Sequence, residues 1–172
     1  MPREVSKNIQ IYPTTFYKRL SSIERNIGQE IDVSCLSKWE MMHLGVKKWT
    51  KDVDIFAKDL LLIPVCECSH WYLVVIILPG LLLQSQQKQE TAIIVFDSLK
   101  DSGTRETTVK NVEHYLYEEM KVKKESRSRF KTRELPAVYP MCPTQDDATS
   151  CGVFLLHYAQ MILSRFYYVF SG

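Results

Sequence analysis

The chain has 172 residues, of which 45% are hydrophobic and 24% are charged, with a formal net charge of +2 at pH 7. This length and balance fit one folded domain with its own core, and they exclude an intrinsically disordered chain. The mild net charge and a sequence pI near 8.2 argue against a nucleic-acid-binding protein, which usually has a clustered basic face.

The cysteines and the longest apolar run indicate the compartment. Five cysteines at irregular spacing do not form a disulfide framework, so we expect a reducing environment. The N-terminal residues lack the apolar core of a signal peptide. The longest apolar run, residues 71–83, is broken by Pro79-Gly80 and is too short to span a bilayer. The sequence therefore predicts a soluble intracellular protein.

The first elements in chain order are the least regular. Apolar positions at Phe16, Leu20 and Ile23 follow a helical spacing, and they predict a short helix within residues 9–25 that a threonine caps. Residues 26–45 mix glycine, aspartate and serine with apolar residues, which favours a loop or an irregular segment.

Three apolar runs of strand length follow, at residues 60–65, 71–78 and 92–96. They are rich in Ile, Val and Leu without helical periodicity, which is typical of strands buried on both faces. Residues 66–69 are the predicted turn of a hairpin between the first two strands. The polar, glutamine-rich residues 84–91 predict a solvent loop before the third strand.

The second half of the chain holds two predicted helices. Apolar residues at spacings of three and four predict one helix over residues 105–122, and another apolar run predicts a helix over residues 151–165. Between them, residues 121–133 carry seven Lys/Arg against one Glu, and residues 137–139 predict an edge strand. We interpret the basic tract as a solvated surface, with an acidic partner or a nuclear-import signal as alternatives. Strands between helices, with one antiparallel hairpin, imply an α+β fold.

Cys151 is the most informative residue for chemistry because it stands directly before an apolar helical run. Thr149 or Ser150 can cap that helix, which leaves Cys151 in the first turn, where the helix dipole favours a thiolate. Gly152 leaves room for a substrate backbone to approach closely. Taken alone, a buried structural cysteine is the commoner explanation of such a residue.

A thiolate nucleophile needs a base, and His70 is the best placed of the four histidines because it opens the second predicted strand. His43 falls in the irregular segment. His114 lies opposite the apolar stripe of its helix, where we expect it to be solvated. His157 is on the same helix as Cys151 but is turned about 240° away from it.

Asp97 and Gln145 complete the set of candidates. Asp97 ends a strand after four apolar residues, where a carboxylate is costly unless it is paired or exposed. Pairing with His70 would orient the imidazole and stabilise its charged form, whereas an aspartate that caps its own turn is the alternative. Gln145 lies six residues before Cys151 and could donate to an oxyanion, although in isolation it is only a loop glutamine.

The order of these residues resembles that of a known family, the ubiquitin-like-protein-specific cysteine proteases, also called SUMO/sentrin-specific proteases. That family has His-Trp opening a strand, a strand ending in Asp-Ser, and a Gln followed six residues later by Cys-Gly. This chain carries His70-Trp71, Asp97-Ser98, Gln145 and Cys151-Gly152. Residues 15–17 and 46–64 also match family segments, so the resemblance covers roughly residues 9–165.

The resemblance implies an α+β, papain-like cysteine protease fold with a central mixed or antiparallel sheet flanked by helices. Residues 1–172 would form a single catalytic domain that is shortened at both ends relative to the family. The family's early tryptophan segment, one wall of its substrate tunnel, has no match here, since Trp39 and Trp49 lie later in the chain. The alternative is therefore a catalytically impaired SUMO-binding module or short isoform.

The resemblance also implies roles for single residues. His70 would be the base, Asp97 would orient it, Cys151 would attack, and Gln145 would help to form the oxyanion hole. Trp71 would line the tunnel for the Gly-Gly tail of the substrate, beside Gly152.

The implied reaction is hydrolysis of the isopeptide bond between SUMO and a substrate lysine, and the chain is most similar to the branch that trims poly-SUMO chains. No metal and no organic cofactor is implied. The expected partners are SUMO, SUMO-conjugated proteins and poly-SUMO chains, without nucleic acid or membrane. We expect a monomer located in the nucleus, with the cytoplasm as a second location.

Two other chemistries fit parts of the pattern. Acyltransferases that use acetyl-coenzyme A have a related His-Asp/Glu-Gln-Cys arrangement, but His70-Trp71 and residues 46–64 favour a protease. Cys66, Cys68 and His70 offer three potential zinc ligands, although their spacing is not that of common zinc modules and no fourth ligand is evident. Zinc bound there would prevent His70 from acting as a base.

Overall fold

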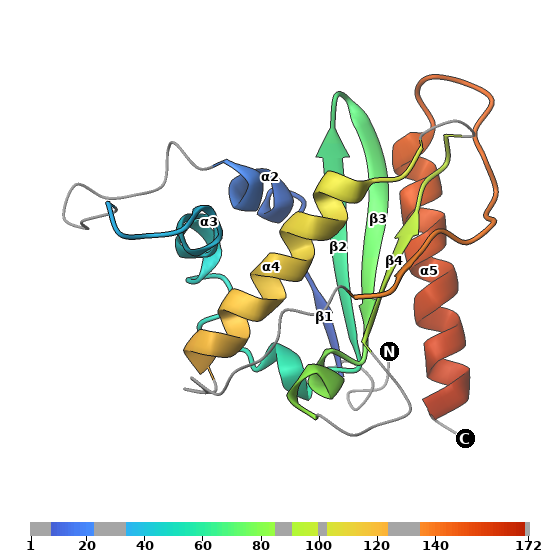
Figure 1. The fold of residues 1–172 in the computed structure, drawn as a ribbon. Helices are drawn as coiled ribbons and strands as arrows, with labels where there is room; N and C mark the ends of the chain where they lie inside the picture. Colours follow the sequence, from blue (N-terminus) through green and yellow to red (C-terminus); the bar gives the residue numbers. More distant parts are fainter. Residues whose placement is uncertain (1–7, 23–33, 85–90, 100–102, 124–134, 171–172) are drawn as a thin grey trace.

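The computed structural model describes residues 8–22, 34–84, 91–99, 103–123 and 135–170, with the side chains of 167–170 excepted. Within these ranges five strands form one mixed sheet, and helices cover both of its faces, which agrees with the predicted α+β class (Figure 1). In sheet order the strands are β1 (Ile9–Ile11), β2 (Leu60–Glu67), β3 (His70–Ile77), β4 (Ala92–Phe96) and β5 (Ala137–Val138). The α-helices are α2 (Phe16–Ser21), α3 (Lys38–Val46), α4 (Glu106–Lys123) and α5 (Cys151–Phe170).

The central strands separate two hydrophobic cores. Strands β2, β3 and β4 pair antiparallel, and β1 and β5 add in parallel at the edges. In β2, Leu61, Ile63 and Val65 face the core under α2, α3 and α4, whereas Leu60 and Leu62 face the core under α5. Both faces of these strands are therefore apolar, which explains why the sequence shows continuous apolar runs rather than alternation.

The β2–β3 hairpin is tighter than predicted. Cys66 and Glu67, expected in the turn, belong to β2, so that the turn consists of Cys68 and Ser69 alone. Both turn residues have positive φ, 49° and 61°, as in two-residue turns whose twist matches the right-handed twist of the strands. Glu67 consequently pairs with His70, which fixes the register of β3 from its first residue.

Helix α3 contradicts the prediction of a loop or irregular segment over residues 26–45, of which 23–33 lie outside the described residues. It begins with a capping box, in which the Glu40 N–H donates to Ser37 Oγ at 3.2 Å. The Ser37 N–H donates in turn to Glu40 Oε2 at 2.7 Å. The buried side chain of His43 then attaches the helix to α4.

The remaining elements follow the predicted order. Helix α2 forms where expected, although the Thr15 side chain makes no capping hydrogen bond. Helices α4 and α5 and the edge strand β5 also form at their predicted places, and α5 is longer than predicted. The three-residue strand β1 was not predicted.

Two predicted segments are only partly covered. Residues 85–90 of the polar loop and residues 124–133 of the basic tract lie outside the described residues. Two short 3-10 helices, η1 (Ile55–Ala57) and η2 (Pro79–Leu83), lie in the connections that the structure describes. None of the described helices combines the length and apolarity that crossing a membrane requires.

Candidate active site

The four predicted catalytic side chains belong to elements that meet at one end of the sheet, the upper end in Figure 1. His70 opens β3, and Asp97 directly follows β4, its antiparallel neighbour. Cys151 opens α5, which packs on β3, and Gln145 lies in the segment before that helix.

His70 and Asp97 form a direct pair. His70 Nε2 lies 2.7 Å from Asp97 Oδ1, and both side chains are largely buried, 11% and 8% exposed. An ionised carboxylate can only accept hydrogen bonds, so Nε2 carries the hydrogen and Nδ1 of the neutral ring is the acceptor. The pair therefore favours the tautomer with its hydrogen on Nε2. A histidine that accepts a thiol proton at Nδ1 requires this tautomer.

Asp97 is held ionised by its neighbours. Burial raises the pKa of this carboxyl, but hydrogen bonds from the Leu99 N–H, from Arg105 and from His70, together with the Arg105 charge, lower it further than burial raises it. The Leu99 N–H donates to Oδ1 at 3.0 Å, while Arg105 donates to Oδ2 from Nε at 2.9 Å and from Nη2 at 2.7 Å. The predicted alternative, an aspartate that caps its own turn, thus coexists with the pairing to His70.

Cys151 is a free thiol, 5% exposed, at the first position of α5. Thr149 and Ser150, predicted as capping side chains, instead donate their hydroxyl groups and backbone N–H groups to the Asp147 carboxylate. These hydrogen bonds lower the pKa of Asp147 to about 2. The Asp147 turn thereby fixes the point at which the helix begins, and with it the position of the thiol.

Contacts of Trp71 and Cys66 show that the start of α5 lies beside the start of β3. A Cβ built on Gly152 would lie 4.0 Å from Trp71 Cδ1, which is ordinary van der Waals contact. Cys66 is the cross-strand partner of Trp71, and its pKa is raised first by burial and then by the nearby Cys151 thiol. Trp71 and Gly152, both predicted to contact substrate, therefore lie close to each other. Each directly follows a predicted catalytic residue in the chain: His70 and Cys151, respectively.

Gln145 is buried, 6% exposed, and is hydrogen-bonded to Ser98, the residue after Asp97. Its backbone N–H donates to the Ser98 carbonyl at 2.8 Å, and Ser98 Oγ donates to Gln145 Oε1 at 2.5 Å. The side-chain Nε2 donates one hydrogen to the Asp147 carbonyl at 2.6 Å. Because an amide NH2 has two hydrogens, the second one remains for another acceptor.

Sequence reasoning missed the residues that support this site. Asp147, two residues before Thr149, had a detectable signal, since Asp at this spacing often forms a turn ahead of a helix. Ser98 was noted only as part of the Asp-Ser motif. Arg105 had no local signal, because eight residues separate it from Asp97 in the chain.

The other histidines lie elsewhere, and the expectation about His43 was wrong. His43 is not in a loop: it lies in α3, and its Nε2 contacts Glu119 Oε2 at 2.5 Å. His114 is partly exposed and stacks on Trp39, with ring centroids 3.5 Å apart. Among the described residues, no three His, Cys, Asp or Glu side chains are arranged to hold a metal.

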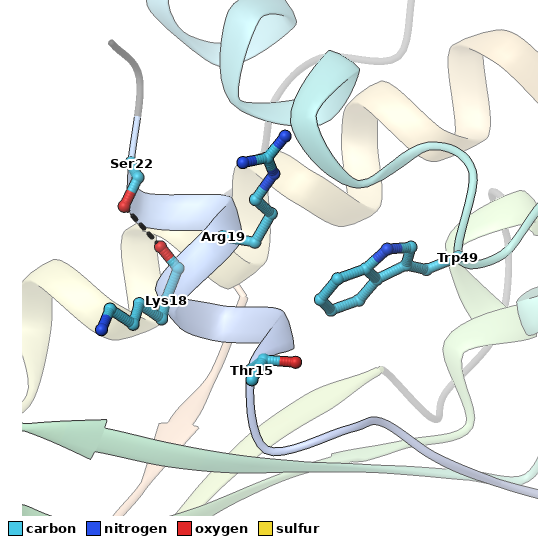
Figure 2. Close-up of a pocket in the computed structure, with 5 residues that line it drawn as sticks. All are labelled: Thr15, Lys18, Arg19, Ser22 and Trp49. Carbon is cyan, nitrogen blue, oxygen red and sulfur yellow. Dashed lines mark hydrogen bonds between the residues drawn. The ribbon is translucent and has the colours of Figure 1, made fainter. Parts of the chain in front are cut away.

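A pocket of about 220 Å³ lies away from these residues, between α2 and Trp49 (Figure 2). Figure 2 shows the indole of Trp49 facing α2, and the Ser22 hydroxyl donating to the Lys18 carbonyl at 2.6 Å. The pocket is lined by Thr15, Lys18, Arg19, Ser22 and Trp49. It contains none of the predicted catalytic residues.

Comparison with known protein families gives a match over nearly the whole chain. Residues 2–171 match the model of the Ulp1 protease family, C-terminal catalytic domain. Sentrin-specific protease 7 of Rattus norvegicus is 29% identical over 91% of this chain and 20% of its own length. The probable ubiquitin-like-specific protease 2B of Arabidopsis thaliana is 31% identical over 94% of this chain and 18% of its own length. The chain thus spans about a fifth of these relatives.

Solved structures show the same fold. A structure described as that of the de-sumoylating protease superposes with a TM-score of 0.70 at 19% identity, and covers 95% of this chain and 54% of its own. The C-terminal Ulp1 protease domain in complex with Smt3, the yeast orthologue of SUMO, superposes with a TM-score of 0.64 at 19% identity. It covers 94% of this chain and 61% of its own. The predicted protease fold is confirmed by these likenesses.

Proposed function

The chain belongs to the Ulp1 protease family, and on that premise we propose that it is a thiol isopeptidase that removes SUMO from modified proteins. One observation carries this proposal: His70 Nε2 lies 2.7 Å from Asp97 Oδ1, beside the helix that Cys151 opens. The SUMO specificity is taken from relatives and neighbours named as sentrin-specific proteases and as a protease bound to Smt3.

In the proposed reaction, the proton of the Cys151 thiol passes to Nδ1 of His70, and Sγ attacks the carbonyl carbon of the isopeptide bond. The oxyanion accepts hydrogen bonds from the Cys151 backbone N–H and from the second Nε2 hydrogen of Gln145. The intermediate collapses as the C–N bond breaks and His70 returns its proton to the lysine amine. Water then hydrolyses the thioester, with His70 again as the base.

Trp71 and Gly152 are the proposed contacts for the substrate tail. The Trp71 side chain lies against Gly152 at the start of α5, so a strand of backbone that runs toward Cys151 would pass along an aromatic surface next to a position without a side chain. A Gly-Gly sequence suits such a passage because it has no side chains of its own.

The first experiment is labelling of the purified chain by SUMO that carries a C-terminal thiol-reactive group, with Cys151→Ala as the control. A covalent adduct that the control lacks would support the nucleophile, the passage and SUMO recognition together. If a folded sample binds SUMO without forming an adduct, the proposal fails in favour of a catalytically impaired binding module. Acetyl transfer from acetyl-coenzyme A would instead favour the acyltransferase.

A finer proposal concerns the substrate form and the location. We propose that poly-SUMO chains are trimmed faster than a single SUMO is removed, by a monomer acting in the nucleus. Cleavage of a SUMO dimer and of a SUMO–fluorophore conjugate by the same preparation tests the first point, and equal kcat/KM would contradict it. Microscopy of the tagged chain tests the second.

A further inference from the structure

The Asp97 carboxylate accepts hydrogen bonds from three residues. Oδ1 accepts from His70 Nε2 at 2.7 Å and from the Leu99 N–H at 3.0 Å. Oδ2 accepts from Nε and Nη2 of Arg105, at 2.9 and 2.7 Å. Because donors occupy both oxygens, the carboxylate cannot rotate about its own axis without losing Arg105 or His70.

Arg105 is itself fixed by Tyr72. Its guanidinium carbon lies 4.5 Å from the centre of the Tyr72 ring, and its side chain is only 21% exposed. The Tyr72 hydroxyl donates to the Glu67 carboxylate and lies 2.7 Å from Thr108 Oγ1. The ring is thus held from both strands of the hairpin and from α4, one helical turn after Arg105.

The same tyrosine also supports the histidine. The His70 and Tyr72 rings are stacked, with centroids 6.1 Å apart and 22° between their planes. Both side chains that donate to Asp97 therefore contact one ring, whose hydroxyl is buried and hydrogen-bonded. Arg105 thus fixes Asp97, and Tyr72 fixes His70. The geometry of the Asp97–His70 pair is therefore set before substrate arrives.

We propose that Arg105 is a positioning residue for the isopeptidase reaction: clamped on Tyr72, it holds Asp97 in the orientation that keeps the hydrogen of His70 on Nε2 and Nδ1 toward the thiol. This inference rests on the proposed function, because Asp97 and His70 act in catalysis only if that function is right. Arg105 touches neither the substrate nor the reacting atoms in this scheme. It acts through Asp97 alone.

The competing explanation is an ordinary ion pair that ties the start of α4 to the end of β4. Such a pair would affect stability but not the His70 ring. The readout that separates the two is the proton resonance of the hydrogen-bonded His70 Nε2–H in an NMR spectrum of the whole chain. A His70→Gln variant assigns the signal, and the Nε2–H of His43, bonded to Glu119, serves as an internal reference.

The variants are Arg105→Gln, Arg105→Lys and, as a control on the helix that follows Arg105, Lys110→Gln at an exposed position. In Arg105→Gln we expect the His70 signal to broaden or vanish while the His43 signal stays. We also expect kcat on a SUMO–fluorophore substrate to fall by about 10- to 100-fold, with KM within about twofold. Arg105→Lys keeps the charge without the two-pronged contact, and it should restore the signal and part of kcat.

Each result decides one question. An unchanged His70 signal and unchanged kcat in folded Arg105→Gln would overturn the inference, even if Asp97→Asn abolishes turnover and so upholds the proposed function. If the parent chain cleaves no SUMO substrate but loses the His70 signal in Arg105→Gln, the proposed function fails while the positioning by Arg105 stands. If Arg105→Gln does not fold, Arg105→Lys decides: a kcat equal to the parental value would overturn the inference, and a partial loss of kcat would support it.

Discussion

Within the part of the chain that the structure describes, two buried histidine–carboxylate pairs are built alike. His70 Nε2 lies 2.7 Å from Asp97, and His43 Nε2 lies 2.5 Å from Glu119. In each pair the second carboxylate oxygen faces a cation: Arg105 for Asp97, and Lys123, at 3.4 Å, for Glu119. In both, burial raises the pKa of the carboxyl, but hydrogen bonds and neighbouring positive charges together lower it further.

The pairs differ in what surrounds them. His43 lies within α3, and its partner on α4 also accepts from Thr50 Oγ1 at 2.7 Å, so the pair joins helices inside the larger core. His70 stands at the tip of a hairpin, beside the helix that begins at Cys151. A histidine–carboxylate pair is therefore no sign of catalysis by itself, because the same contact can join two helices or orient a base.

The largest expected effect separates the pairs by activity. Asp97→Asn should lower kcat on a SUMO–fluorophore substrate by about 10³-fold, because the amide can place its NH2 against Nε2 and favour the wrong tautomer. SUMO binding, measured by calorimetry, should stay within about twofold. The corresponding change in the other pair, Glu119→Gln, should leave kcat per folded molecule unchanged. Equal kcat in Asp97→Asn and the parent would remove Asp97 from the mechanism.

The next effect separates the pairs by stability. Glu119→Gln leaves His43 and Lys123 without their buried partner, and it should lower the free energy of unfolding by about 3 kcal/mol. Urea denaturation monitored by tryptophan fluorescence measures this. The matched control is Glu106→Gln, an exposed position in the first turn of the same helix that accepts from Thr104 Oγ1, and it should change the free energy by less than about 1 kcal/mol. Similar losses in both variants would mean that the His43–Glu119 pair contributes no more to the free energy of unfolding than an exposed glutamate does.

The contribution of the His43–Glu119 pair to stability should depend on pH. The folded-state pKa of Glu119 is lowered, so its ionised form stabilises the fold above the unfolded-state pKa of about 4.3, and this contribution is lost as pH falls through the folded value. The stability difference between the parent and Glu119→Gln should therefore shrink below about pH 4. A difference that stays constant from pH 7 to pH 3 would contradict the assignment.

The smallest effect probes the substrate side of the His70 pair. A methyl group at Gly152 would make ordinary contact with Trp71, so Gly152→Ala should fold, and removal of a helical glycine should even stabilise it by up to about 1 kcal/mol. The methyl would add bulk between Gly152 and Trp71, beside which the substrate tail is proposed to run, and KM should rise by about threefold to tenfold. Thermal unfolding and steady-state kinetics on one sample measure both. An unchanged KM would place the substrate tail elsewhere.

The sequence predicted those strands and helices whose pattern lies within a few neighbouring residues. Strands buried on both faces leave continuous apolar runs, so β2, β3 and β4 were found, whereas the three residues of β1 carry too little pattern. Helix α3 was missed although Ser37 and Glu40 have the spacing of a capping box.

Local sequence patterns pointed to each predicted catalytic residue separately, and the family resemblance assigned these residues to one active site. The contact between His70 and Asp97 was predicted, while the third partner, Arg105, was not, because its contact depends on where α4 begins. The pair of His43 and Glu119 gave no sequence signal at all, since 76 residues separate them. Long-range pairing between helices has no periodicity that could reveal it.

The two-residue turn of Cys68 and Ser69 has one more consequence. Successive side chains of a strand point to opposite faces, and directly paired residues share one face, so the pairing of Glu67 with His70 across this turn decides which side of the sheet receives His70 and which receives Trp71. A slip of one residue in this pairing would exchange them, placing the indole on the face of α4 and the imidazole on the face of α5. The register that this turn sets therefore governs the whole site, and the chain keeps it with two residues whose φ angles suit glycine better.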